Sequence, residues 1–170
     1  YGREWLFERY DSWVKNPNSS KLFIILGKAG IGKTAFAANL ARKRPEIVGI
    51  HFCKYNDTDR ANPKKALMSL AYHLSTQLPK YAEELVKLND LDKLEEKNVH
   101  RLFDYILVEP LSKIPEPSDV KVLIIDALDE SLNNGIYELL DVIAADFLKT
   151  PKWLKLLVTS RAEAEIDRKL

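Results

Sequence analysis

The run GKAGIGKT, residues 27–34, holds the residues best suited to chemistry. It matches the phosphate-loop pattern G-x-x-x-x-G-K-[ST], with a strand-like run before it and a helix-like run after it. The three glycines let the backbone adopt positive φ angles and approach a phosphate closely. Backbone N–H groups of such a loop, with the amino end of the next helix, form a positive cup for phosphate. The expected phosphate-binding residues are Gly27, Lys28, Ala29, Gly30, Ile31, Gly32, Lys33, Thr34 and Ala35.

The last two residues of the motif carry side chains that suit a nucleotide bound with Mg²⁺. The Lys33 ammonium is a mobile point charge that can span the β- and γ-phosphates. The Thr34 hydroxyl can ligate Mg²⁺, which prefers oxygen ligands. The simpler alternative is a glycine-rich turn that only reverses the chain. The complete pattern between a strand and a helix favours the phosphate site.

A second group of candidate residues follows the apolar run in VLIIDALDE, residues 122–130. A carboxylate at the position of Asp126, where the strand leaves the sheet, can hold Mg²⁺ opposite Thr34. Asp129 and Glu130 are candidates to orient or deprotonate an attacking water. The alternative is helix capping, because acids after a strand often begin the next helix. With the phosphate loop upstream, we expect Asp126 to bind metal and Glu130 or Asp129 to act with Lys33 in catalysis.

A third candidate group ends the run LKLLVTSR, residues 154–161. Thr159, Ser160 and Arg161 would follow a buried strand, and the carboxyl ends of parallel strands share one crevice. Arg161 is therefore expected to contact the γ-phosphate and report its presence. The alternative is a surface arginine where the strand leaves the sheet.

These motifs depend on alternating strands and helices. The predicted strands are 21–26, 47–55, 120–126 and 154–160, each apolar along its length. Asn62 and Pro63 have the residue types of a helix N-cap and first helical position, and Pro110 is expected to kink or end its helix. The predicted helices are 3–14, 33–44, 63–78, 81–88, 98–114 and 135–149.

Apolar strands separated by helices predict a parallel sheet that is covered on both faces. We therefore expect an α/β protein with the three-layer P-loop NTPase fold and a mostly parallel central sheet. We also expect a strand between the phosphate-loop strand and the acidic strand, as in the additional-strand (ASCE) class. Residues 1–20 would form an N-terminal helix and linker, and 21–170 a single nucleotide-binding core that is truncated at its carboxyl end.

The composition favours a soluble globular domain. The 170 residues are 46% hydrophobic and 30% charged, with a formal net charge of +1, which predicts neither nucleic-acid nor membrane binding. The single cysteine, Cys53, and the lack of a secretory signal favour a cytoplasmic protein. His51 and Cys53 are more consistent with packed strand residues than with a zinc site. Trp5 and Trp13 are expected to pack inward.

Taken in order, the motifs resemble a NACHT-type nucleotide-binding domain of the STAND class of P-loop NTPases. The similar stretches are YGREWL (1–6), GKAGIGKT, IIDALDE (124–130), where that family often has glycine in place of Ala127, and LLVTSR (156–161). The resemblance implies an ATP/ADP-dependent switch with slow hydrolysis inside a larger signalling or scaffold protein. It implies that Arg3 lies near the base, that Glu130 is the catalytic base and that Arg161 is a sensor.

The same resemblance implies that the partners are other domains of the same chain and further proteins, with homo-oligomers in the full-length protein. The guanine-recognition pattern [NT]-K-x-D is absent from the sequence, which favours adenine. Two alternatives stay open. One is an interaction module that binds nucleotide without turnover. The other is a small phosphotransferase, which would need an arginine-bearing lid and an acceptor pocket that the sequence does not indicate.

Overall fold

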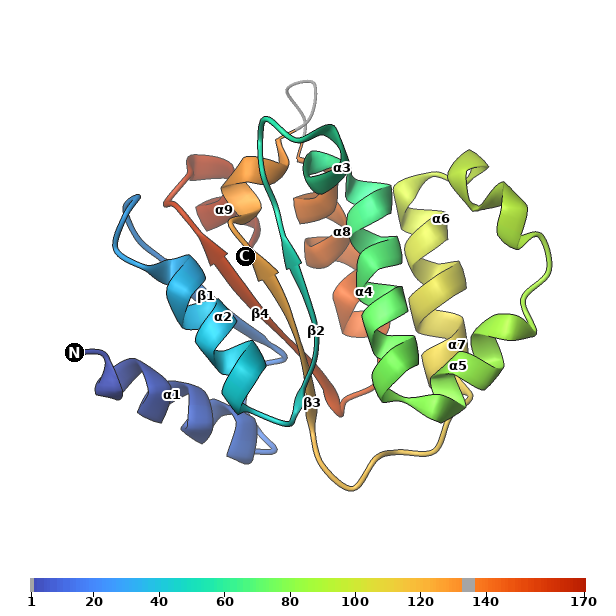
Figure 1. Ribbon diagram of the computed structural model, residues 1–170, viewed down its shortest axis with the longest axis horizontal. Helices are drawn as coiled ribbons and strands as arrows, with labels where there is room; N and C mark the ends of the chain where they lie inside the picture. The colour runs from blue at the N-terminus through green and yellow to red at the C-terminus, as the bar shows by residue number, and fades with distance from the viewer. Residues whose placement is uncertain (1, 133–136) are drawn as a thin grey trace.

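A computed structural model describes residues 2–132 and 137–170 (Figure 1). Within these residues, four parallel strands form one sheet in the order β1-β4-β3-β2. Strand β4 lies between β1, which leads into the phosphate loop, and β3, which ends at the acids, so the expected inserted strand is confirmed. The strand bounds are β1 (Leu22–Leu26), β2 (Ile47–Phe52), β3 (Lys121–Asp126) and β4 (Leu154–Ser160).

Helices cover both faces of the sheet and make the three layers that the sequence predicts (Figure 1). One face is covered by α1 (Glu4–Lys15) and α2 (Lys33–Lys43). No helix in the described ranges has the length and apolar character needed to cross a membrane. The other α-helices are α3 (Thr58–Ala61), α4 (Pro63–Gln77), α5 (Pro79–Val86), α6 (Val99–Phe103), α7 (Glu109–Ser112), α8 (Glu138–Asp146) and α9 (Ala164–Lys169). Shorter turns are the 3-10 segments Leu91–Glu96, Leu128–Ser131 and Phe147–Lys149 and the π segment Asp104–Val108.

Strand β3 is apolar from Val122 to Ile125 because both of its faces are buried. In β3, Val122 and Ile124 belong to the cluster with α1 and α2, and the alternate residues Leu123 and Ile125 belong to the cluster with α4 and α8. All four are at most 2% exposed. The packing therefore holds the carboxyl end of β3 in a fixed place, immediately before the acids.

Several element ends differ from the sequence prediction. Strand β2 ends at Phe52 rather than at residue 55. The Cys53 N–H still donates to the Asp126 carbonyl (3.0 Å), and the chain leaves the sheet after that hydrogen bond. Helix α4 begins as predicted, since the Asn62 side chain accepts from the two N–H groups after Pro63. Helix α8 begins at Glu138, and residues 135 and 136 of the predicted helix lie outside the described residues.

Pro110 neither ends nor sharply interrupts its helix. The chain runs from α6 through the π segment into α7, which ends at Ser112. Proline has no N–H, so the Ile106 carbonyl lacks its usual donor four residues later. The Tyr81 hydroxyl donates to that carbonyl at 2.6 Å. A partner from α5 therefore replaces the missing helical hydrogen bond.

The expectation that both N-terminal tryptophans pack inward is half right. Trp13 is buried between α1 and the sheet, whereas Trp5 is 55% exposed. His51 and Cys53 are buried, as expected for packed residues of this region. The His51 Nε2–H faces the Arg60 carbonyl at 3.0 Å, so this ring is used in tethering the loop after β2.

Candidate functional site

The loop after β1 has the conformation that its glycines suggest, with one exception. Gly30 and Gly32 have φ angles of +78° and +86°, which glycine adopts without strain. Gly27 does not have a positive φ, so that part of the prediction is wrong. Its lack of a side chain serves close packing instead, because a Cβ there would lie 2.1 Å from Cδ1 of Ile31. The Gly27 N–H donates to the Ser160 carbonyl (3.1 Å), which joins the loop to the end of β4.

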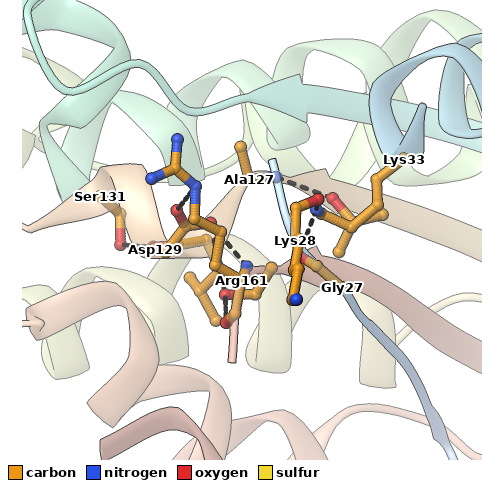
Figure 2. A network of polar contacts seen from close by, with 10 residues as sticks. Gly27, Lys28, Lys33, Ala127, Asp129, Ser131 and Arg161 are labelled. Atoms are coloured by element: carbon orange, nitrogen blue, oxygen red, sulfur yellow. Dashed lines mark hydrogen bonds and ion pairs between the residues drawn. The ribbon is translucent and has the colours of Figure 1, made fainter. Parts of the chain in front are cut away.

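The amino end of α2 opens onto this loop. Its N-cap is Gly32, which has no side chain to pair with the first N–H groups of the helix. The Lys33 ammonium donates to the carbonyls of Gly27 (2.5 Å) and Lys28 (2.7 Å) (Figure 2). Within the described residues this uses two of its three N–H bonds, which leaves one for a phosphate oxygen. Unpaired N–H groups and a cation thus lie together, as an anion site requires.

A buried carboxylate links the end of β3 to α2 and to β4. Asp126 is 2% exposed, and its two oxygens accept hydrogen bonds from Thr34 Oγ1 (2.7 Å) and Thr159 Oγ1 (2.5 Å). Thr159 Oγ1 also accepts from the Ala127 N–H (2.9 Å). The fold thus brings together Thr34 and Asp126, which are 92 residues apart in the chain. Their role as metal ligands stays a prediction.

The sequence predicts Thr159 at this edge of the sheet but indicates no specific role for it in the site. Thr159 is fully buried, and its two contacts hold both the Asp126 carboxylate and the backbone that follows it. A hydroxyl at the end of an otherwise apolar strand was the available signal. It could not be interpreted without knowing that β4 lies beside β3.

The turn after Asp126 is tied to the end of β4 by a second carboxylate. One oxygen of Asp129 accepts from the Arg161 N–H (3.1 Å) and from Ser160 Oγ (3.3 Å), and the other lies 3.5 Å from Arg161 Nε (Figure 2). The Asp129 side chain is 9% exposed, and that of Arg161 is 54% exposed. Both oxygens of Asp129 therefore face Arg161. Glu130 is the second acid in the lining of the adjacent cavity.

The cavity enclosed by these groups has a volume of 270 Å³. It brings together residues from all three predicted motifs. Its lining comprises Ala29, Gly30, Gly32, Lys33, Thr34, Ala127, Asp129, Glu130 and Arg161. The predicted loop residues outside this lining are Gly27, Lys28, Ile31 and Ala35.

Arg3, which is expected to lie near the base, contacts the phosphate loop, and its place relative to a base stays a prediction. Its guanidinium contacts the loop rather than the cavity, donating to the carbonyl oxygens of Gly32 (2.9 Å) and of Ile31. These contacts join the start of α1 to the loop. No local pattern predicts an arginine on the carbonyl side of the motif.

The acids of the site also affect the thiol behind them. Burial raises the pKa of the Cys53 thiol, and the negative charges of Asp126, Asp129 and Glu130 raise it further. A thiol with a raised pKa stays protonated near neutral pH and is a poor nucleophile. Cys53 therefore acts as part of the apolar wall behind the carboxylates.

The comparison with family models identifies the chain. Residues 2–161 match the family described as Nephrocystin 3, N-terminal. The chain belongs to this family. The matched residues run from before α1 to Arg161, so all three motifs lie inside the family match. A search of curated proteins gave no match.

Proposed function

We propose that this domain binds ATP and ADP with Mg²⁺ at the carboxyl edge of its sheet. We further propose that it hydrolyses ATP slowly and serves as a regulatory switch in a larger signalling or scaffold protein. One observation carries the proposal: Thr34, which lines the cavity at the phosphate-loop motif, donates from Oγ1 to Oδ2 of the buried Asp126 at 2.7 Å. A hydroxyl and a carboxylate in contact beside such a loop are the protein ligands that Mg²⁺ uses with nucleotides.

The donor set fits a magnesium ion that is shared with phosphate. Both protein ligands are hard oxygens, which Mg²⁺ prefers. The described residues contain no group of three or more His, Cys, Asp or Glu side chains that would hold a metal by themselves. Mg²⁺ would therefore complete its coordination with phosphate oxygens and water. When bound, it would neutralise the charge that develops on the phosphates.

The side chains of the cavity have distinct proposed roles. Lys33 and the N–H groups at the start of α2 bind the phosphates. Glu130 orients the attacking water and accepts its proton. Asp129 positions Arg161, and Arg161 responds to the γ-phosphate from beside the cavity. Adenine remains the favoured base because the guanine-recognition pattern is missing from the sequence.

Two structural features support the likeness to NACHT-type domains of the STAND class. Strand β4 lies between β1 and β3, as in additional-strand P-loop proteins. Ala127 has a φ of +58°, a conformation that favours glycine, and glycine is often found at this position of the NACHT motif. By the same likeness we propose a cytoplasmic protein that acts through its neighbouring domains and protein partners, with homo-oligomers of the full-length protein.

The first experiment is to denature the purified protein and identify the nucleotide that is released from it. We expect ADP, whereas GDP would overturn the assignment of the base. The second is to measure phosphate release with Mg²⁺ and ATP from the wild type, Glu130→Gln and Lys33→Ala. We expect slow release that either substitution abolishes.

A nucleotide-binding module without turnover is the second candidate. It is favoured by the contacts of Asp129, whose carboxylate is already bound by Arg161 and Ser160. Among the described acids that line the cavity, Glu130 alone is then left to activate a water. ADP binding together with phosphate release no faster than that of Lys33→Ala would assign this function instead. No binding of either nucleotide would contradict both candidates.

A further inference from the structure

Arg3 holds the phosphate loop from the side opposite its N–H groups. It lies directly before α1, and its carbonyl accepts the first hydrogen bond of that helix from the Leu6 N–H (2.9 Å). Its guanidinium donates to the Gly32 carbonyl at 2.9 Å and to the Ile31 carbonyl. One planar side chain thus contacts two successive carbonyls of the loop.

Because the peptide bond is planar, the contacts of Arg3 with the loop carbonyls also determine where the N–H groups of the same peptide units point. In a trans peptide the C=O and the N–H of one unit point in opposite directions. The Ile31 carbonyl shares its unit with the Gly32 N–H, and the Gly32 carbonyl shares its unit with the Lys33 N–H. Holding both carbonyls on one side therefore directs both N–H groups to the other side, where the anion site lies. A cation at the carbonyl oxygens also polarises the two units in the favourable sense.

Helix α1 is itself fixed, so it can serve as the support for Arg3. Tyr10 is fully buried, and the rings of Phe7 and Phe36 pack with centroids 4.7 Å apart, which joins α1 to α2. At the other end of the helix, the Lys155 ammonium donates to the carbonyls of Trp13 (2.8 Å) and Asn16 (3.2 Å). The guanidinium therefore starts from a helix that is attached at both ends.

We propose that Arg3 is a positioning residue that orients the peptide units of Gly32 and Lys33 toward the phosphates. It acts through the backbone of the loop and makes phosphate affinity depend on the position of α1. This role differs from contact with the base, and it rests on the proposed nucleotide binding. It predicts that Arg3 supports the binding of any polyphosphate, with or without a nucleoside.

The test compares ATP with sodium tripolyphosphate, which has the phosphates but no base, in the presence of Mg²⁺. Calorimetry measures both affinities for the wild type and for Arg3→Met, which keeps a long side chain but removes the donors. The matched control is Arg9→Met, because Arg9 is an exposed arginine of the same helix. Arg3→Lys keeps the charge without the planar fork. Thermal unfolding confirms that each variant is folded.

We expect Arg3→Met to weaken both ligands by the same factor, about three- to tenfold, since it removes two charge-assisted hydrogen bonds at a partly exposed place. Arg3→Lys should fall between Arg3→Met and the wild type, and Arg9→Met should change neither affinity. Weaker ATP binding with unchanged tripolyphosphate binding would overturn the inference in favour of a contact with the base. Unchanged affinity for both ligands would also overturn it. A wild type that binds neither ligand would contradict the proposed function itself.

Discussion

The two edges of the central sheet both carry lysines and carboxylates, but they use them differently. At the amino edge, where the parallel strands begin, the ammonium groups of Lys21 and Lys155 each donate hydrogen bonds to several protein acceptors. At the carboxyl edge, Lys33 and the acids of β3 and its turn keep part of their bonding capacity for a ligand. The difference separates charges that stabilise the fold from charges available for chemistry.

At the amino edge each ammonium has three acceptors, which equals its number of N–H bonds. Lys21 Nζ donates to the Thr150 carbonyl (3.0 Å), to Thr150 Oγ1 (2.9 Å) and to the Pro151 carbonyl (2.6 Å). Lys155, which is 3% exposed, donates to two carbonyls at the end of α1 and to Ser19 Oγ. These lysines fasten loops and a helix end to the sheet.

A cavity near the amino edge has a volume of 540 Å³, which is twice the 270 Å³ of the cavity at the phosphate loop. Two of its charged residues pair with each other, since Arg44 binds both oxygens of Asp11 at 3.0 Å, and a third, Glu46, accepts from the Tyr10 hydroxyl at 2.9 Å. Cavity size therefore does not locate the site. The smaller cavity has the unpaired N–H groups and the partly engaged lysine.

The largest expected effect is a loss of stability at the amino edge. Lys155→Met should lower the free energy of unfolding by about 3 kcal/mol, because three acceptors lose their donor in a buried place. Urea denaturation measures this change. The control is Lys15→Met, an exposed lysine at the end of α1, which should change stability by less than about 0.5 kcal/mol. Equal effects of the two substitutions would show that Lys155 is not a structural anchor.

At the carboxyl edge, the main effect should be on ligand binding. Lys33→Ala should weaken the binding of Mg²⁺·ADP by about 10- to 100-fold, the loss expected for hydrogen bonds to a charged group. The change in the free energy of unfolding should stay below about 1 kcal/mol, because Lys33 has fewer protein acceptors than Lys155. Lys43→Ala, at an exposed lysine in the last turn of α2, is the matched control and should bind normally. A large loss of stability with unchanged binding would reverse the distinction between the two edges.

A smaller effect is expected in the pH dependence of stability. Burial lowers the pKa of Lys21 from 10.5 to about 8. Between these values the unfolded chain binds more protons than the folded protein, so this group makes stability rise as pH rises. The stability of the wild type relative to Lys21→Met should therefore increase from pH 7.5 to 9.5, measured by urea denaturation at each pH. A difference that stays constant or falls over this range would contradict a lowered pKa.

The smallest expected effect concerns the backbone of the turn after β3. Ala127 has a φ of +58°, where glycine has no steric cost. Ala127→Gly should leave stability unchanged or raise it by up to about 1 kcal/mol, whereas Ala38→Gly, at an exposed position inside α2, should lower it by about 1 kcal/mol. Thermal unfolding of both variants makes the comparison. If Ala127→Gly lowered stability as much as Ala38→Gly does, backbone strain at Ala127 would be excluded.

Much of the fold followed from the sequence because its signals are local. Apolar runs of strand length, the Asn62 cap and the glycine-lysine-threonine motif each depend on near neighbours in the chain. The strand order was also predictable in part, since the motifs must converge at the carboxyl ends of parallel strands. Local patterns did not reveal the π segment before Pro110 or the hydroxyl from another helix, that of Tyr81, which donates to the Ile106 carbonyl.

The site was predicted by residue type but not by its contacts. The sequence identified Asp126, Asp129 and Arg161, yet it did not show that Thr159 shares the first carboxylate or that Arg161 pairs with the second. These contacts join residues about 32 positions apart that meet through the β3–β4 pairing. The place of Arg3 on the loop carbonyls could not be predicted for the same reason.

The most direct test of nucleotide binding at the carboxyl edge is an NMR titration of the ¹⁵N-labelled protein with Mg²⁺·ADP. The predicted result is saturable shifts of the amide signals of Gly30, Gly32, Lys33 and Thr34, with the signals of Trp13 and Lys155 unchanged. Amide signals of the loop that stay in place at millimolar Mg²⁺·ADP, or shifts confined to the amino edge, would contradict the account.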